Sequence, residues 1–427
     1  MTKVAVLAGI GGFLPPLTVT NDELARRLDT SDDWIRTRTG ITQRHFASPG
    51  TTTSSLAAEA AGKAMKCAET DTVDAVLLAT TTPDRPCPAT APTVAAKLGL
   101  EGVAAYDISA VCSGFLYGLA TASGLIAGGI AERVLVIGAD VYSTIVDPAD
   151  RSNAVIFGDG AGAVVVRAGH PGEPGAMGPF DLGSDGTGRD LITVRAGGVE
   201  QRLSGRTAQP SDRYFTMSGK PVFRSAVHRM AASARAVLDQ AGLTAGHVDR
   251  LVGHQANLRI LRSLAEKLGI PPERVIRNID KVGNTAAASI PLALDHGHSH
   301  RLLTPGDVVL LTAFGGGLTW GSTVLSWPEL PRLHDSSDTT QKDGPAMSAT
   351  LEEVVGILTD RFTVERSKMT PETTFEDLDF DSLFLVEFQL VLEERFKVLI
   401  EEDTISPMDT LSSVAGLIDA RRARGDR

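Results

Sequence analysis

One cysteine, one histidine and one asparagine in this sequence could act together on a carbonyl group. Cys112 stands where a predicted strand, "AAYDISAV", changes to "SGFLYGLATASGLIAGG", whose small and apolar residues predict a buried helix. His254 follows a second predicted strand, and Asn284 lies in a Gly-Asn turn ahead of an alanine-rich helix. All three residues lie at the ends of predicted elements, and together they are a set of residue types used in nucleophilic catalysis.

The position of Cys112 predicts a reactive thiol. The N-terminus of a helix favours negative charge, which lowers the pKa of a thiol and increases the fraction of nucleophilic thiolate. Taken alone, Cys112 is better read as a small apolar core residue, and His254 and Asn284 as capping or core polar groups. Their combination favours catalysis over these structural roles.

Three further motifs resemble cofactor or metal sites, and the sequence argues against each. "GIGG" at 9–12 runs into two prolines, and "GDGAGA" at 158–163 precedes a predicted strand, whereas a dinucleotide fingerprint opens a helix. "DHGHSHR" at 295–301 has three histidines without nearby cysteines or a carboxylate cluster, so it predicts an exposed helix end. We therefore expect no NAD, no flavin and no metal.

The composition indicates a soluble globular protein. The 427 residues are 22% charged and 42% apolar, and this length suffices for two or three domains. Three widely spaced cysteines predict a reducing, cytoplasmic setting. We predict a first strand at 4–7 rather than a signal peptide, and a core helix at 113–130 rather than a membrane span, so no membrane contact is expected.

The charge is concentrated at one end of the chain. Residues 346–427 hold 18 acidic and 9 basic residues, a balance of −9, which leaves −2 of the total of −11 for the rest. This asymmetry argues against nucleic acid as a partner and indicates a separate acidic module.

Periodicity divides the chain into three parts. Residues 1–328 alternate short Val/Ile/Leu runs with helical patterns, which is typical of an α/β domain. Residues 329–347 lose all periodicity and predict a flexible linker, and residues 348–427 predict a small helical bundle. "TVDAVLLATT" and "HVDRLVGHQA" share a pattern that suggests an internal duplication in the first part. Its further strands are expected at 75–79, 134–138, 163–166, 251–253 and 308–312.

The tail carries helix-capping signals. Thr350 and Glu353 suggest a capping box for a helix that ends near residue 362. Asp381 could cap a helix over 382–396, and Thr410 could cap the last helix.

Several motifs resemble those of β-ketoacyl-acyl-carrier-protein synthase III, the initiating condensing enzyme of fatty acid synthesis. They occur in order over residues 1–327 and are "SDDWIRTRTGITQRHFA", "AVCSGF", "DRSNAVIFGDGAGAVV", "GHQANLRI", "GNTAAASIP" and "FGGGLTWGS". The resemblance implies the thiolase fold, in which two similar βαβ-rich halves stack in five αβαβα layers, and it implies a cytoplasmic homodimer.

The same resemblance assigns roles to the three residues. Cys112 would hold the acyl group of an acyl-CoA starter, while His254 and Asn284 would stabilise the enolate formed when malonyl-ACP loses carbon dioxide. Backbone N–H groups of Cys112 and Gly316 would form the oxyanion hole.

Substrate binding is also implied by the resemblance. Trp34, Arg38 and Arg151 would line the mouth that binds coenzyme A, and Arg259 would contact the carrier or its pantetheine phosphate. Cys87 would wall the acyl pocket of the neighbouring subunit. By the same resemblance, acetyl-specific members have a Phe at that position. The smaller side chain of Cys87 leaves more room in the pocket and therefore predicts a branched or longer starter.

The tail resembles an acyl carrier protein, a bundle of four helices. "DLDFDSLFLVEFQLVLEERF" contains the D-S-L motif, so Ser382 would carry 4′-phosphopantetheine. Phe384 and Phe388 are expected at the surface or edge of their helix, as part of an apolar docking face. The carrier could serve its own subunit or the partner subunit.

Two other functions use the same features. An acyltransferase could use Cys112 to move an acyl group without condensation, although Asn284 then has no enolate to stabilise. A non-catalytic scaffold could instead present cargo on Ser382 to other enzymes.

Overall fold

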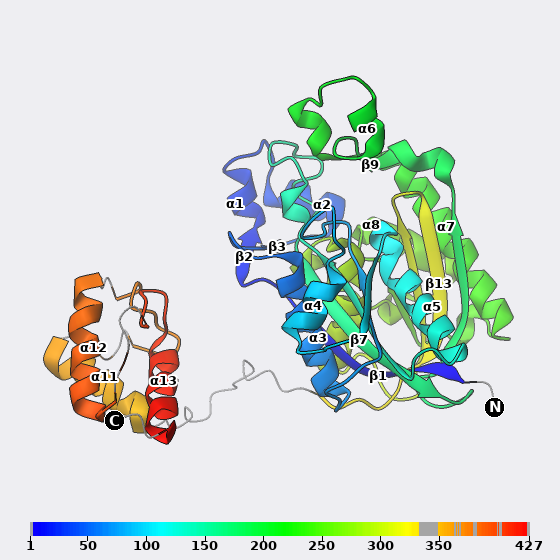
Figure 1. Ribbon diagram of the computed structural model, residues 1–427. Coiled ribbons are helices and arrows are strands. Elements are labelled where there is room, and N and C mark those ends of the chain that lie inside the picture. The colour runs from blue at the N-terminus through cyan, green and yellow to red at the C-terminus, as the bar shows by residue number, and fades with distance from the viewer. Residues whose placement is uncertain are drawn as a thin grey trace. The chain divides into compact units, whose positions relative to one another are not determined.

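The computed structural model describes residues 3–332 and, in the tail, residues 349–424 apart from 363, 365, 367, 368, 379–381, 399 and 401–403. The chain forms two compact units, Met1–Leu333 and His334–Arg427 (Figure 1). Within the described residues, no helix is both long and apolar enough to cross a membrane.

Two sheets form the centre of the first unit. The first has the order β1-β7-β6-β4-β5, and the second has the order β11-β12-β13-β8. The strands of the first sheet are β1 (Val4–Phe13), β4 (Ala75–Ala79), β5 (Ala104–Ile108), β6 (Arg133–Asp140) and β7 (Gly160–Gly169). The strands of the second sheet are β8 (Met177–Ser184), β11 (Arg250–Gly253), β12 (Val308–Gly315) and β13 (Thr319–Ser326).

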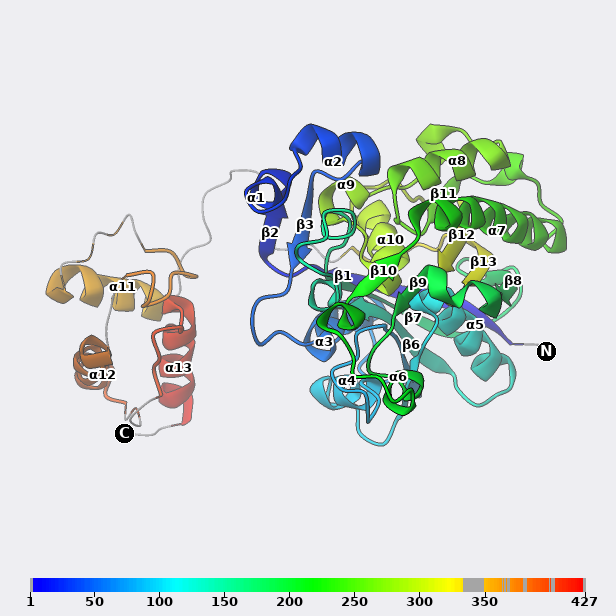
Figure 2. The same cartoon turned by 90° about the horizontal axis from the view of Figure 1, so that it is seen from above.

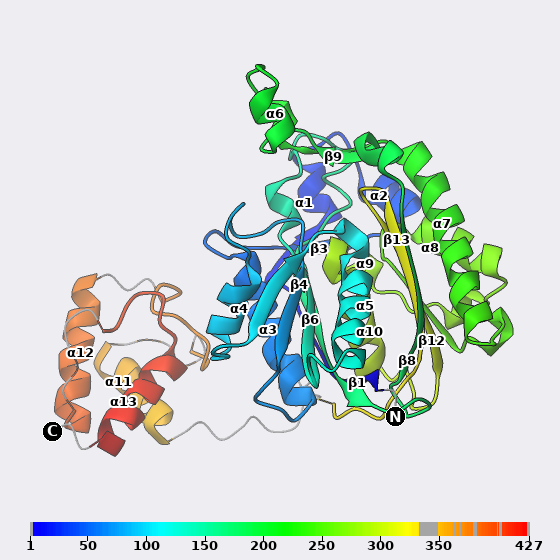
Figure 3. The ribbon, with the colours of Figure 1, turned by 45° about the vertical axis from the view of Figure 1, so that its right-hand side comes forward.

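Helices cover both faces of each sheet and complete the predicted αβαβα layers. Two helices, α5 and α10, pack between the sheets, as Figure 3 shows for α5. The outer face of the first sheet is covered by α3 and α4, and that of the second by α7 with α8 beside it. These helices are α3 (Thr53–Cys67), α4 (Ala91–Lys97), α5 (Gly114–Ala127), α7 (Gly219–Gln240), α8 (Leu258–Leu268) and α10 (Ser289–Ser299).

The double covering explains why apolar runs predicted the strands well. Every residue of β4, "AVLLA", is buried, because a parallel strand between two helical layers has no solvent face. The prediction was wrong for "GIGG", which lies inside β1 rather than after a strand. A methyl group on Gly11 would lie 2.5 Å from the amide nitrogen of Ala64, so the glycine lets α3 approach β1 closely.

Smaller elements gather at one end of the layers. Figure 2 shows the antiparallel pair β2/β3 beside α1 and α2. The strands β9 and β10 form a second pair, with α6 between them in sequence. The bounds are β2 (Leu17–Thr20), α1 (Asn21–Ala25), α2 (Asp32–Thr39), β3 (Gln43–Phe46), β9 (Ile192–Val194), α6 (Val199–Leu203), β10 (Phe215–Met217) and α9 (Ile279–Val282).

The chain after the last strand stays in contact with the first unit. Leu330 packs against the apolar core, and the Pro331 carbonyl oxygen lies 3.2 Å from Cys67 Sγ and from His298 Nε2. His298 is therefore buried, and the prediction that all three histidines of "DHGHSHR" form an exposed helix end was wrong for it. Residues 333–347 of the predicted linker lie outside the described residues.

Three helices are described in the tail: α11 (Ala349–Phe362), α12 (Ser382–Phe396) and α13 (Leu411–Arg424). Thr410 caps α13 as predicted, because its Oγ1 accepts a hydrogen bond from Ser413 N at 3.0 Å. The predicted capping box at Thr350 is wrong. The helix α11 begins at Ala349, so Thr350 lies inside it, and the Thr350 hydroxyl group donates a hydrogen bond to Asp419 Oδ1 at 2.6 Å. Asp381 lies outside the described residues, and no fourth α-helix occurs among the described ones.

The predicted apolar docking face of the tail is wrong for Phe388. Its side chain is fully buried, and its ring centroid lies 5.2 Å from that of Phe375 and 5.9 Å from that of Phe362. The side chain of Phe384 lies outside the described ones. Phe388 is therefore a core residue of the tail.

Truncating Phe388 should destabilise the tail alone. We expect Phe388→Ala to lower the free energy of unfolding of the tail by about 3–5 kcal/mol, the usual cost of removing a buried aromatic ring. Scanning calorimetry of the full chain would show the tail transition shifted down and that of residues 1–333 unchanged. Met408→Ala, at a side chain 68% exposed, is the matched control. An unchanged tail transition in Phe388→Ala would contradict the assignment.

Candidate active site

Cys112 lies in a tight turn between a strand and a central helix. It is the middle residue of a 3₁₀ turn, η1 (Val111–Ser113), which joins β5 to α5 as the sequence predicted. Val111 has φ +47°, a left-handed conformation that costs a β-branched residue about 1–3 kcal/mol. A methyl group on Gly315 would lie 2.8 Å from Cys112 N, so the end of β12 packs directly on this turn.

The predicted lowering of the Cys112 pKa is wrong. Burial raises the pKa of the thiol well above its usual range, and the nearby carboxylate of Asp140 raises it further. Desolvation disfavours the thiolate, and here it outweighs the helix N-terminus. The resting side chain is therefore a neutral thiol, and its proton must leave as the sulfur attacks.

His254 follows β11 directly and is almost completely buried. Its backbone N–H donates to Thr312 O at 2.9 Å, which fixes the residue beside β12. Among the described residues no partner binds its Nδ1. Burial lowers the pKa of the imidazole to about 3, so the ring is neutral at physiological pH and keeps one N–H donor.

Gln255, which the sequence analysis missed, holds the loop after β11. Its backbone N–H donates to Ser289 Oγ at 2.6 Å, its Nε2 donates to Gly253 O at 2.8 Å, and its Oε1 accepts from Asn278 N at 3.2 Å. A fully buried glutamine with these bonds orients the adjacent His254.

Asn284 has an amide group with a fixed orientation. Its Oδ1 accepts a hydrogen bond from Ala286 N at 3.0 Å, which turns Nδ2 the other way as a donor. The backbone is held on both sides, because Asn284 N donates to Ile156 O at 2.9 Å and Gly158 N donates to Asn284 O at 3.0 Å. The residue is 5% exposed.

One packing contact brings together the segments that carry the three predicted residues. The turn η1, which carries Cys112, packs against a second 3₁₀ turn, η7 (Ala286–Ala288), which begins two residues after Asn284. Ser289, the residue after η7, accepts a hydrogen bond through its Oγ from the backbone N–H of Gln255, which follows His254. We call the meeting of these segments the buried junction.

The two turns of the buried junction have the same local geometry. Ala286 in η7 has φ +47°, the same value as Val111 in η1, and each turn leads into a central helix, α10 or α5. This correspondence agrees with the internal duplication suggested by the sequence. No residue type at Val111 or Ala286 signals a positive φ, so the sequence could not show it.

Asp140 fastens the second turn to the first sheet. Its Oδ2 accepts from Ala287 N at 3.0 Å, and its Oδ1 accepts from the backbone N–H groups of Thr81 and Thr82 at 2.7 and 3.1 Å. Burial raises the pKa of this carboxyl group to about 6, against these hydrogen bonds, which lower it. In the sequence, only one feature indicates a role for Asp140: it is an acidic residue at the carboxyl end of the buried strand β6.

Aromatic rings surround the thiol. The rings of Tyr142 and Phe157 stack with centroids 4.5 Å apart, and Phe215 meets both edge-on. These rings belong to the same apolar cluster as Cys112, so the thiol lies in surroundings suited to an acyl chain.

The residues predicted to bind coenzyme A also lie together. The guanidinium carbons of Arg38 and Arg151 lie 4.3 and 5.1 Å from the centroid of the Trp34 ring. Arg259 joins them from α8, because its Nη2 donates to Thr37 O in α2 at 3.0 Å. We call the group of Trp34, Arg38 and Arg151 the coenzyme A mouth.

The remaining predicted residues have different positions. Gly316 is buried directly after Gly315, the residue that packs on Cys112 N. Cys87 is exposed in the single chain. Ser382 is the first residue of α12, and its side chain lies outside the described ones. No group of three metal-binding side chains occurs in the described part of the chain.

Alkylation kinetics would test the neutral thiol. We expect the iodoacetamide reaction of Cys112, measured by mass spectrometry in a Cys67→Ser/Cys87→Ser background, to accelerate about tenfold per pH unit between pH 7 and 9. The reason is that the thiolate fraction rises tenfold per unit below a raised pKa. The exposed Cys87, alone in a Cys67→Ser/Cys112→Ser variant, is the control. A rate for Cys112 that levels off below pH 8 would contradict the raised pKa.

Comparisons with known proteins match both units. Family models match residues 106–186 and 238–327, described as 3-oxoacyl-[acyl-carrier-protein (ACP)] synthase III and its C-terminal part, and residues 352–420, described as a phosphopantetheine attachment site. The chain is 64% identical over 330 residues to beta-ketoacyl-[acyl-carrier-protein] synthase III 3 of Streptomyces coelicolor, and 51% identical over 330 residues to beta-ketoacyl-[acyl-carrier-protein] synthase III of Pseudomonas aeruginosa. Each match covers 77% of this chain and 98% of the relative.

Solved structures agree with these matches. The 3-oxoacyl-(acyl carrier protein) synthase III of Pseudomonas aeruginosa superposes with a TM-score of 0.72 at 50% identity, covering 77% of this chain and 100% of that one. The priming beta-ketosynthase of a polyketide biosynthetic pathway gives a TM-score of 0.72 at 34% identity, covering 77% and 98%. The predicted fold and the two resemblances are thereby confirmed.

Proposed function

The chain belongs to the β-ketoacyl-[acyl-carrier-protein] synthase III family, and from this premise we propose the chemistry of its own residues. It is a condensing enzyme of fatty acid or polyketide biosynthesis with a phosphopantetheine attachment domain. The proposed reaction joins an acyl group from acyl-CoA to malonyl-ACP with loss of carbon dioxide. The observation that supports it is the packing of η1 against η7 in the buried junction, which brings together the segments that carry one thiol and two uncharged N–H donors.

Cys112 takes the acyl group in the first step. Its Sγ attacks the thioester carbon, the bond from that carbon to the coenzyme A sulfur breaks, and the thiol proton leaves with the coenzyme A sulfur. The backbone N–H groups of Cys112 and Gly316 hold the oxygen that becomes negative. Because the neutral thiol gives its proton to the leaving group, this step needs no permanent thiolate.

His254 and Asn284 act in the second step. Their N–H donors hold the thioester oxygen of the malonyl group while the bond to its carboxylate breaks and the electron pair forms an enolate. A neutral imidazole and an amide suit this role, because a carboxylate would repel the developing charge. The enolate carbon then attacks the acyl carbon, and the Cys112 sulfur leaves and takes up one proton.

The coenzyme A mouth supports the choice of starter donor. An indole ring beside two guanidinium groups suits an adenine base and its phosphates. Arg259, held beside α2, is proposed to contact the carrier or the pantetheine phosphate.

The tail is proposed to be a tethered carrier of the same reaction. Ser382 begins a helix of 15 residues, and a helix N-terminus favours a phosphate group, so its position fits attachment of 4′-phosphopantetheine. When attached, that arm supplies a thiol that holds acyl groups as thioesters. The covalent tether raises the local concentration of the carrier, which favours transfer within a subunit or to its partner.

We also propose a homodimer in which Cys87 walls the acyl pocket of the partner subunit. The exposure of Cys87 in the single chain is compatible with this role, and its small side chain favours a branched or longer starter. An acyltransferase without condensation leaves the fixed amide of Asn284 without a role, so condensation is the better account.

Two variants should separate the half-reactions. We expect Asn284→Asp to lower carbon dioxide release from malonyl-ACP by about 10²–10³-fold, because the variant loses an oxyanion donor and gains a charge. Acylation of Cys112 by acyl-CoA, read by intact mass, should persist in this variant.

Cys112→Ala is the reciprocal control. It should lose acylation and keep carbon dioxide release. Transfer of acyl groups by the unaltered chain without any carbon dioxide release would favour the acyltransferase, and absence of acylated Cys112 would favour the scaffold.

Attachment at Ser382 gives a separate prediction. Incubation with coenzyme A and a phosphopantetheinyl transferase should add one phosphopantetheine mass to the chain, because Ser382 is the D-S-L serine at the start of α12. Ser382→Ala should block the addition, whereas Ser413→Ala, at a serine in α13, should not. A full mass increase in Ser382→Ala would refute the assignment.

A further inference from the structure

A fully buried arginine lies between the coenzyme A mouth and the turn that carries Asn284. Arg44 in β3 has no exposed surface. Its hydrogen bonds go to uncharged oxygen atoms, and the described part of the chain provides no ion pair for it. Burial lowers its pKa to about 10, which still leaves the guanidinium charged at neutral pH. The Asp32 and Glu23 carboxylates favour the charged form without forming an ion pair with it. Burying a charge without a direct ion pair is costly, so this arrangement calls for an explanation.

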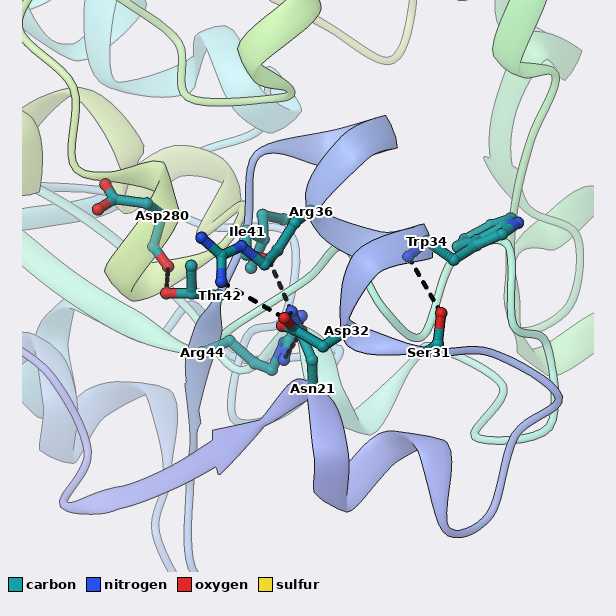
Figure 4. Close-up of polar contacts among 9 residues, drawn as sticks. All are labelled: Asn21, Ser31, Asp32, Trp34, Arg36, Ile41, Thr42, Arg44 and Asp280. Carbon is teal, nitrogen blue, oxygen red and sulfur yellow. Dashed lines mark hydrogen bonds and ion pairs between the residues drawn. The ribbon is translucent and has the colours of Figure 1, made fainter.

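One edge of the guanidinium holds the segments that lead to the coenzyme A mouth. Nη1 donates to Val19 O at 3.1 Å and to Asn21 Oδ1 at 2.8 Å. Asn21 relays this contact, because its Nδ2 donates to Asp32 Oδ1 at 2.7 Å and to Ile41 O at 2.8 Å. Asp32 is the first residue of α2, the helix that bears Trp34 and Arg38, and Ile41 lies two residues after its end. Figure 4 shows Asp32, Trp34 and Ile41 in this segment.

The second terminal nitrogen of the guanidinium group, Nη2, holds the segment that pairs with Asn284. Nη2 donates to Val155 O at 2.7 Å, and the next residue, Ile156, accepts the backbone N–H of Asn284 at 2.9 Å. The stem of Arg44 also lies under this turn, because methyl groups on Gly158 or Gly283 would each lie 3.1 Å from its Cβ.

Thr42, two residues before Arg44, makes a second connection to the Asn284 turn. The N–H and the hydroxyl group of Thr42 both donate to Asp280 O, at 2.8 and 2.6 Å (Figure 4). Asp280 lies in α9, which ends two residues before Asn284. The start of β3 is thus tied to the Asn284 turn on both sides of the Arg44 side chain.

We propose that Arg44 is a positioning residue that fixes the coenzyme A mouth and the Asn284 amide relative to one another. A guanidinium group is planar and rigid, so its two terminal nitrogens hold their two sets of partners in one geometry. A methionine of similar length would fill the space but would leave the oxygen atoms of Val19, Asn21 and Val155 without this donor. The guanidinium group is thus needed to hold these partners in place. This inference rests on the proposed function, because it assigns the two bound segments to the two half-reactions.

The two limbs of the network can be cut separately. Asn21→Ala removes the link to α2 and leaves Val155 bound, so we expect KM for acyl-CoA in Cys112 acylation to rise at least fivefold. Carbon dioxide release from malonyl-ACP should stay within twofold of the unaltered chain. Arg44→Met cuts both limbs, so we expect at least tenfold losses in both half-reactions. Arg133→Met, at an exposed arginine at the start of β6, is the matched control.

The outcomes separate positioning from a structural role. Equal losses of both half-reactions in Asn21→Ala would show a role in folding alone and would overturn the proposal, as would unchanged kinetics in a folded Arg44→Met. If Arg44→Met does not fold, Asn21→Ala alone tests the proposal. A raised KM for acyl-CoA with unchanged carbon dioxide release would then support positioning by Arg44. Because each variant is compared with the active unaltered chain, an unaltered chain without either half-reaction would instead refute the proposed function.

Discussion

The contact between the turns η1 and η7 is the constraint on which the rest of the first unit depends. Each turn ends in a helix that packs between the two sheets, so the contact lies where both halves of the fold meet. It holds Cys112 and the Asn284 turn together, and Asp140 fastens it to β6 through the Ala287 N–H. The left-handed residues Val111 and Ala286 are strained there, and such strain persists only where surrounding packing fixes it.

Burial at this contact also sets the charge states. It raises the pKa of the Cys112 thiol and lowers that of the His254 imidazole, so both side chains are neutral. Neutral side chains at these two positions suit a reaction in which negative charge develops only during the steps themselves. The donors of His254 and Asn284 then act on that charge in a site of low dielectric, where they are most effective. Arg44 holds its charge outside this contact, against the segment that pairs with Asn284.

The sequence predicted those features that depend on local pattern. Continuous apolar runs located β4 and β6, and the element-end positions of Cys112, His254 and Asn284 located the site. Features that depend on tertiary burial were missed or wrong. The pKa of Cys112 follows from desolvation rather than from its helix, and α12 has apolar residues on every side, so its pattern could not show that Phe388 faces the core. Arg44 and Asp140 are ordinary charges in sequence and become distinctive only when buried.

The protonation state of His254 tests the central claim most directly. NMR of the full chain with ¹⁵N-labelled histidine, with His254→Gln to assign the signals, would report the ring between pH 5 and 8. We predict the shifts of a neutral imidazole throughout this range, because the pKa near 3 lies well below it. Titration of the His254 ring with a midpoint near the ordinary histidine value of about 6.5 would contradict the account.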